Sequence, residues 1–278
     1  LGYSAKELKK IITSVDFASF SDDTFGFIRD IIRLVKQYGW NKGDRLLDWF
    51  GNLIEEKTGT KDLTFAQLHE LTKTKGMKDL YVIGFNLTQG IPEIYSYETT
   101  PNMRIRYATR ISMSIPFYFQ AMRRKGQVLV DGGVTWNYPI TLFDHARYLS
   151  NSKNGEKKRG QTNDKIILNH ETLGFRLGSD KKYLQLEPGT KPQKIQKPLR
   201  NIKDYAQNIL TFMLETANQQ YISNKDWNRT VYINIGDVKT TDFKLSDSKV
   251  DWLVNEGQKG VKKHFKWRDG PKGVKKPV

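Results

Sequence analysis

One carboxylate stands where chemistry could be done, at the end of the apolar stretch QVLVDGG. The stretch predicts a buried strand that ends at Asp131, and Gly132 and Gly133 then permit a sharp turn and a close approach of the backbone to a neighbour. An Asp-Gly pair after a strand is typical of a hairpin turn. It also suits a catalytic carboxylate, because functional groups of open α/β sheets gather at the carboxyl ends of strands. The local residues leave both interpretations open.

Other side chains with catalytic potential are scattered. The sequence contains no cysteine, and its histidines lack the spacing of metal ligands. These histidines are His69, His145, His170 and His264. We interpret His145 as structural, with Asp144 as a hydrogen-bond partner for its ring. Ser112 and Ser114 precede Pro116, where we expect a helix to end, so they would satisfy backbone groups there or line a cleft.

Hydrophobic periodicity predicts helices that alternate with strands. A capping box from Ser4 to Glu7 begins the first helix, and Asp44 is expected to cap a helix over 46–56. Further helices are expected over 25–38, from Thr64 onward, and over 104–114, 139–149, 205–218 and 250–265. Strands are expected over 80–90, after Pro92 as its hairpin partner, over 127–131, within 165–178 as one strand or a pair, and over 229–237. This alternation indicates an α/β fold, a three-layer α/β/α sandwich with a mainly parallel sheet.

Four segments in a fixed order, TFAQL, LYVIGFNLTQG, RYATRISMSIPFYF and VLVDGGVTWNYPI, carry a resemblance to a known family. Their series resembles the patatin-like phospholipases over residues 1–140, and more loosely over 165–258. The matching positions are Thr64, Phe65, Leu80, Tyr81, Leu87, Thr88, Ser112, Ile115, Pro116, Phe119, Asp131, Gly132, Gly133, Asn137 and Pro139.

The resemblance implies a Ser/Asp dyad that cleaves fatty-acyl esters of phospholipids, without metal or other cofactor. Asp131 matches the dyad carboxylate, which takes the serine proton directly. The pKa of an ordinary aspartate is about 3.9, so Asp131 needs a desolvated and fixed site to act as the general base. The residues expected to shape the site are Gly132, Gly133, Asn137, Ser112 and Pro116.

The sequence departs from the family in one respect, since it contains no Gly-x-Ser-x-Gly. We expect residues 1–258 to form a patatin-like domain that lacks its N-terminal strand, oxyanion loop and nucleophile elbow. Within it, residues 151–163 form a basic loop insertion, and residues 259–278 form a basic tail. The missing segment either lies upstream or has been lost. We expect the 278 residues alone to be inactive on p-nitrophenyl esters.

Positive charge is concentrated in two segments. Of the net charge of +16, residues 151–203 carry +8 and residues 259–278 carry +7. Both segments are rich in Gly, Pro, Asn and Lys, which is typical of exposed loops. The excess charge serves either solubility or attraction to an anionic partner. Because Phe265 and Trp267 lie among the lysines, the alternative function is a catalytically dead module that binds anionic membranes through this tail.

Several classes of partner and location are disfavoured. Nucleic-acid binding rests on charge alone, since no nucleic-acid-binding motif occurs. No apolar stretch approaches the roughly 20 residues of a membrane-spanning helix, and no signal-peptide pattern is visible. We expect a location in the cytoplasm or at the periphery of a membrane, or secretion as an effector. The sequence does not indicate which oligomeric state the protein has.

Overall fold

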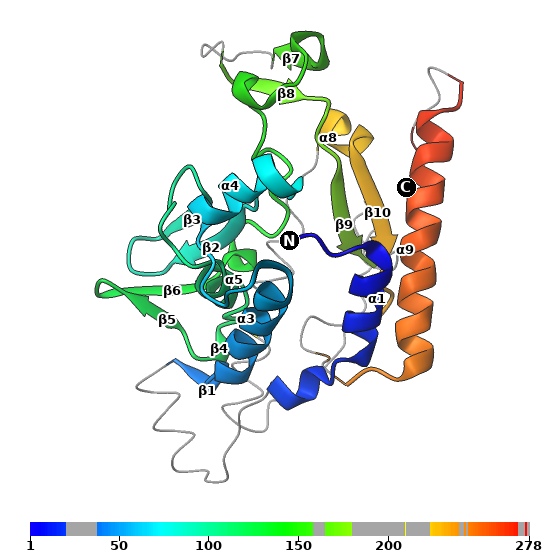
Figure 1. The fold of residues 1–278 in the computed structure, drawn as a ribbon. Coiled ribbons are helices and arrows are strands. Elements are labelled where there is room, and N and C mark those ends of the chain that lie inside the picture. Colours follow the sequence, from blue (N-terminus) through cyan, green and yellow to red (C-terminus); the bar gives the residue numbers. More distant parts are fainter. Residues whose placement is uncertain are drawn as a thin grey trace. The chain divides into compact units, whose positions relative to one another are not determined.

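The computed structural model describes residues 1–20, 38–157, 165–179, 209, 223–238, 242, 244–271 and 276 (Figure 1). The chain divides into two compact units. Unit 1 comprises Leu1–Asn137 and Pro198–Ala217, and unit 2 comprises Tyr138–Lys197 and Asn218–Val278. The helices expected over 25–38 and 205–218 fall almost entirely outside the described residues.

Unit 1 contains four described α-helices and two 3₁₀ helices. They are α1 (Ala5–Ser14), η1 (Phe17–Phe20), α3 (Asp44–Thr58), α4 (Phe65–Lys75), α5 (Ile105–Ser112) and η2 (Gly132–Val134). The predicted capping box of α1 is confirmed, because the Ser4 amide donates to the Glu7 side chain and the Glu7 amide donates to the Ser4 hydroxyl. Thr64 caps α4 in the same way. The predicted Asp44 cap is wrong: Gly43, with φ of 76°, is the N-cap, and Asp44 lies in the first turn, where its charge complements the helix dipole.

A four-stranded sheet is the centre of unit 1. Its order is β3 (Ile91–Tyr95), β2 (Val82–Asn86), β6 (Gln127–Asp131) and β5 (Met122–Arg124). The predicted hairpin of β2 and β3 is confirmed, as is the buried strand β6. All three neighbouring pairs are antiparallel. For β2–β3 and β5–β6 the reason is the tight connection that joins the two strands. A separate parallel pair joins β1 (Gly39–Asn41) to β4 (Phe117–Phe119).

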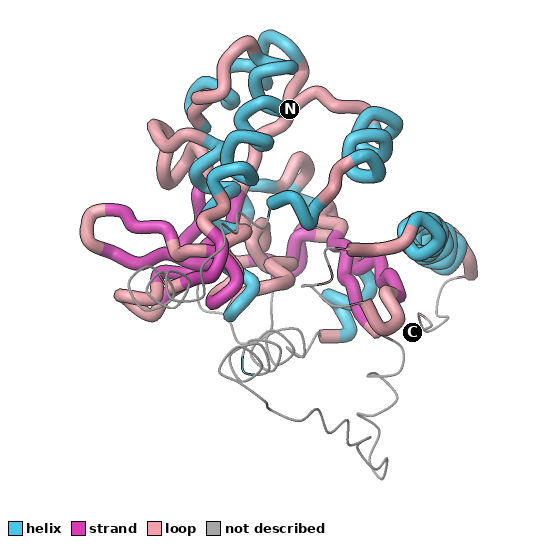
Figure 2. The backbone as a smooth tube through the Cα atoms, turned by 90° about the horizontal axis from the view of Figure 1, so that it is seen from below, coloured by secondary structure: helices cyan, strands magenta, loops and turns pink. Residues whose placement is uncertain are grey.

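The core of unit 1 lies between its helices and this sheet (Figure 2). Phe65 and Leu68 of α4, Ile105 and Ile111 of α5, and Leu129 of β6 are at most 2% exposed. Burial of each such side chain contributes about 1.5–3 kcal/mol. Because α5 packs on both β2 and β6, the core fixes the end of α5 relative to the end of β6.

Unit 2 combines two small sheets with helices. Strands β7 (Gly155–Lys157) and β8 (Ile167–Asn169) pair antiparallel, whereas β9 (Gly174–Gly178) and β10 (Thr230–Asn234) pair parallel. The helices are η3 (Ala146–Tyr148), η4 (Ser152–Asn154), α8 (Asn224–Asn228) and α9 (Asp247–Arg268). Helix α9 packs along β10, as the long red-orange helix of Figure 1 shows. With helices and parallel strand pairs, the α/β class is confirmed.

Two predictions for unit 2 need correction. The helix expected over 139–149 is wrong: this stretch consists of turns and the short η3, because the His145 ring caps the Arg147 amide and the His145 backbone bridges to Ile166. The helix expected over 250–265 is confirmed as α9, which Ser246 caps and which extends to Arg268, so the first half of the basic tail expected over 259–278 is helical rather than an exposed loop. The expected loop at 151–163 contains η4 and β7 in its described part.

Among the described helices, none combines the length and the apolar character that crossing a bilayer requires.

Candidate functional site

Asp131 is the last residue of β6, and hydrogen bonds hold both its backbone and its side chain. Its amide donates to the Ser114 carbonyl at 3.0 Å, and its Oδ1 accepts from the Gly133 amide at 2.8 Å. The chain continues into the 3₁₀ helix η2 (Gly132–Val134), which Asp131 caps. The hairpin-turn interpretation is therefore wrong, and the carboxylate sits on a fixed strand-to-helix turn.

The environment of Asp131 makes it a stronger base than an ordinary aspartate. The residue is half-buried, and desolvation by the surrounding protein raises the pKa of its carboxyl to about 6. The hydrogen bond from the Gly133 amide lowers the pKa but does not offset the burial. A carboxyl group with this pKa is mostly ionised at neutral pH and lies close to the range that suits a general base.

The two glycines provide space rather than unusual backbone angles. A Cβ atom on Gly132 would lie 2.7 Å from the Ile83 Cγ2 and 2.8 Å from the Ile83 backbone. A Cβ atom on Gly133 would lie 2.9 Å from the Asn137 Oδ1 and 3.2 Å from the Asp131 Oδ1. The Asn137 amide and the Asp131 carboxylate therefore border the same small space above Gly133. The structure brings together these four residues that the sequence named.

The end of α5 supplies the other side of the turn. Ser112 is the last residue of this helix, and Pro116 follows four positions later. The contact between this segment and Asp131 is the carbonyl of the buried Ser114, midway between them. Ser112 and Pro116 thus flank the residue that holds the Asp131 backbone.

Arg110, which the sequence analysis did not single out, fixes the Ser114 turn. Its side chain is fully enclosed, with the residue only 2% exposed. The guanidinium donates to the Ser114 hydroxyl at 2.6 Å, and to three backbone carbonyls, those of Gly43, Lys42 and Gln120. Nothing in the local sequence IRYATRIS distinguishes Arg110 from the exposed arginines of the chain. Through Ser114, Arg110 acts on the position of Asp131.

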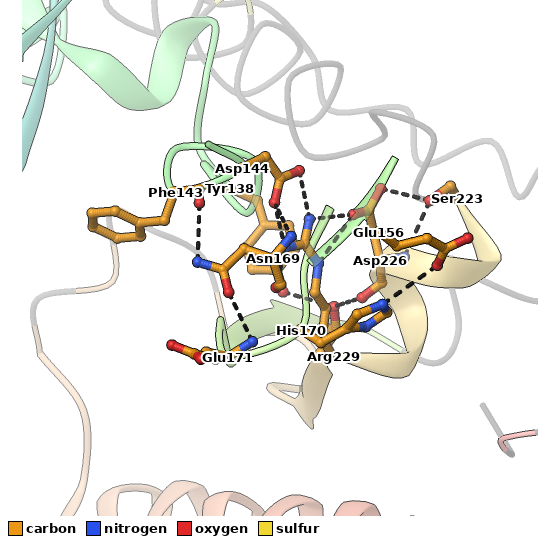
Figure 3. Close-up of polar contacts among 11 residues, drawn as sticks. Tyr138, Phe143, Asp144, Glu156, Asn169, His170, Glu171, Ser223, Asp226 and Arg229 are labelled. Atoms are coloured by element: carbon orange, nitrogen blue, oxygen red, sulfur yellow. Dashed lines mark hydrogen bonds and ion pairs between the residues drawn. The ribbon is translucent and has the colours of Figure 1, made fainter. Parts of the chain in front are cut away.

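Unit 2 contains a second buried arginine, at the centre of Figure 3. Arg229 donates to both carboxylate oxygens of Asp144, at 2.6 and 2.9 Å, and to Asp226 at 2.6 Å. Burial lowers the pKa of Arg229, but the hydrogen bonds to Asp144 and Asp226 outweigh it, so the net change is a raised pKa. Asp144 also accepts from the Asn169 amide. The predicted role of Asp144 is corrected, since it forms this buried ion pair while the His145 ring accepts from the Arg147 amide.

The described part of the chain holds no group of three or more His, Asp or Glu side chains arranged to bind a metal ion. The candidate site is therefore the Asp131 turn, built from β6, η2 and the end of α5.

These features define an α/β protein with a desolvated carboxylate on a Gly-Gly turn at a strand end. A family model described as patatin-like phospholipase matches residues 1–144, more than half of the chain. The chain belongs to the patatin-like phospholipase family, and hydrolysis of lipids is the class of function that this family defines.

Similar proteins come from viruses and bacteria. The chain is 28% identical over 266 residues to uncharacterized protein R571 of Acanthamoeba polyphaga mimivirus, covering 95% of this chain and 77% of that one. It is 26% identical over 275 residues to uncharacterized protein YqhO of Bacillus subtilis (strain 168), covering 93% and 79%. It is 36% identical over 98 residues to the "Probable lipid hydrolase 463L" of invertebrate iridescent virus 6, covering 35% and 31%.

A solved structure, that of VipD from Legionella pneumophila, aligns with 92% of this chain at 18% identity and a TM-score of 0.41. The chain spans less than half of that protein, or 45% of its length.

Proposed function

We propose that the protein is a lipid acyl hydrolase of the phospholipase A type, in which Asp131 is the general base of a Ser/Asp dyad. The raised pKa of Asp131, to about 6, on a fixed turn is the observation that carries the proposal. The family match and the name of the iridescent-virus relative support a lipid substrate. The proposed substrate is a fatty-acyl ester of a phospholipid.

The geometry suggests how the base would work. The Gly133 amide holds Oδ1, so Oδ2 is the oxygen that we expect to receive the proton of the serine hydroxyl as that hydroxyl attacks the ester carbonyl. A direct transfer needs no histidine. The sequence contains no Gly-x-Ser-x-Gly, and the proposal places the nucleophile in a part of the protein outside these 278 residues.

The test compares acyl hydrolysis of phospholipid by the intact protein and by its Asp131→Asn variant. Asparagine keeps the acceptor for the Gly133 amide but cannot take a proton, so kcat should fall about 10²- to 10⁴-fold. Asp48→Asn is the matched control, because its side chain is 71% exposed on α3, and it should retain full activity. Undiminished turnover by a folded Asp131→Asn protein would exclude Asp131 as the base.

The second candidate function is a catalytically inactive module that binds anionic membranes. Four exposed lysines in the second half of α9 favour this membrane-binding function. These lysines are Lys259, Lys262, Lys263 and Lys266. Each basic residue near an anionic surface contributes about 1 kcal/mol of attraction. This function is compatible with catalysis, and loss of esterase activity in every preparation of the intact protein would leave it as the sole candidate.

A further inference from the structure

A lysine side chain is enclosed at one end of α9 in unit 2. Lys276 is only 8% exposed, although lysine is a residue that proteins almost never bury fully without a partner. Its Nζ lies 4.8 Å from the ring centroid of Trp227 and 5.4 Å from that of Trp267. The rings belong to α8 and α9, and both distances fall within the range of cation–π attraction.

Two backbone carbonyls complete this enclosure. We call it the ammonium cage, and it consists of the rings of Trp227 and Trp267 and the carbonyls of Trp227 and Thr230. The Nζ of Lys276 donates to the Trp227 carbonyl at 2.8 Å and also to the Thr230 carbonyl. Thr230 is fully buried at the start of β10, and its carbonyl is also 3.0 Å from the Nδ1 of His264. The acceptors are therefore fixed by a strand and a helix end rather than by mobile side chains.

The chemistry of the cage fits one class of ligand. Aromatic faces attract any cation, but the carbonyls require N–H donors. A primary ammonium has three such donors, whereas a quaternary ammonium has none. Desolvation, and secondarily the positive charge of Lys263, lower the pKa of Lys276 to about 8. Burial therefore disfavours the charged lysine, and the two indole rings and the two carbonyls are what hold it in the cage. A free primary ammonium has the same three donors and can make the same contacts in place of the tethered one.

We propose that the ammonium cage is a binding site for a primary alkylammonium group, which the chain's own Lys276 fills in this structure. The site is built from unit 2 alone and does not depend on Asp131 being a base. Ethanolamine, free or as a lipid headgroup, has the required chemistry.

The test empties the cage with Lys276→Ala, which truncates the side chain, and titrates the intact protein with n-butylammonium while tryptophan fluorescence is recorded. The variant should give a saturable change with an affinity at least tenfold higher than that of the wild type, whose cage is filled. Tetramethylammonium should bind at least fivefold more weakly than n-butylammonium. Lys262→Ala, at an exposed position on α9, removes the same charge and should behave as the wild type.

Further variants assign the signal and the source of the ligand. Trp267→Leu added to Lys276→Ala should abolish saturable binding, and Lys276→Ser is the second variant if the alanine protein does not melt cooperatively. Increased binding of the variant to phosphatidylethanolamine vesicles over phosphatidylcholine vesicles would identify a headgroup as the source. Binding of soluble ethanolamine alone would identify a free amine. Equal responses of variant and wild type, or equal affinity for the two ammonium ions, would overturn the proposal.

Discussion

At the residue scale, the desolvation that makes Asp131 a stronger base also lowers the stability of the folded protein. The pKa of Asp131 is raised from 3.8 to about 6, so between these pH values the folded protein holds a proton that the unfolded chain has released. This unfavourable contribution is absent below pH 4, grows as pH rises from about 4 to 6, and is complete above that window. Stability lost at a functional residue in this way is a common trade against activity.

The consequence is testable by urea unfolding. Asp131→Asn should be more stable than the wild type at pH 7.5 by about 1–3 kcal/mol, since a pKa difference of one corresponds to about 1.4 kcal/mol. The advantage should shrink between pH 6 and pH 4 and vanish below it. Asp48→Asn, at an exposed position, should show no such pH-dependent gain. A variant that is less stable at every pH would show that the carboxylate is not desolvated.

The two glycines after Asp131 should tolerate alanine differently. Gly132→Ala places a Cβ against the backbone of Ile83, which cannot yield, so we expect a loss of about 1–3 kcal/mol in unfolding free energy. Gly133→Ala instead presses on the side chains of Asn137 and Asp131. It should lower catalytic turnover more than stability. Gly257→Ala, where a Cβ meets nothing within 4 Å, is the control and should not destabilise the protein. Equal effects of Gly132→Ala and Gly133→Ala on both properties would contradict this division.

The sequence could predict the residues of the turn but not the residues that hold it. Asp131 and the glycines form a contiguous pattern, and a strand followed by Asp-Gly-Gly can be read from local order alone. Arg110 and Arg229 leave no such pattern, because each is also bound to a partner far away in the chain: Gly43 is 67 residues from Arg110, and Asp144 is 85 residues from Arg229. Only tertiary packing determines that these arginines are buried.

At the element scale, helix ends were predicted well where a side-chain cap specifies them and poorly elsewhere. The predicted capping box at Ser4 is confirmed, and the helix expected from Thr64 begins at Phe65 with Thr64 as its N-cap. The helix expected over 139–149 fails where the His145 backbone bridges to Ile166, a long-range contact that residues 139–149 do not encode. Strand pairing has the same limit, since β9 pairs with β10 and not with its sequence neighbour β8.

The connection between α5, β1 and β4 depends on Arg110, and its removal should loosen that part of unit 1. Arg110→Met keeps most of the side-chain volume but removes the donor to the Ser114 hydroxyl and to the Gly43, Lys42 and Gln120 carbonyls, of which Gly43 keeps the Leu47 amide. Each unsatisfied buried group costs about 1–3 kcal/mol, so we expect a total loss of about 3–5 kcal/mol in unfolding free energy. Arg123→Met, at an exposed arginine of β5, should cost less than about 1 kcal/mol.

The same variants distinguish positioning from simple stability. At temperatures where Arg110→Met remains folded, its kcat should fall while its KM for phospholipid stays near the wild-type value, because the Ser114 carbonyl no longer fixes Asp131. Unchanged kcat in the folded variant would confine Arg110 to a structural role.

At the scale of the whole molecule, the positive charge has a defined location. The sequence places +7 in residues 259–278, and the structure arranges its first half as the end of a helix. Phe265 and Trp267, which we expected to anchor in a bilayer, are half-buried, and Trp267 contributes to the ammonium cage. Within α9, attraction to a membrane therefore depends on the exposed lysines rather than on these rings.

Lys262 and Lys266 are four residues apart and lie on one face of α9, so reversing both charges should remove a large part of that attraction. We expect Lys262→Glu with Lys266→Glu to weaken binding to phosphatidylserine vesicles at least tenfold, as judged by co-sedimentation, since each lysine contributes about 1 kcal/mol. Lys73→Glu, an exposed lysine of α4, is the control and should bind as the wild type. Raising the salt to about 1 M, where charges are screened within about 3 Å, should release the wild-type protein as well. Equally strong binding of the wild type to neutral vesicles would show that the attraction is not electrostatic and that the lysines of α9 serve solubility instead.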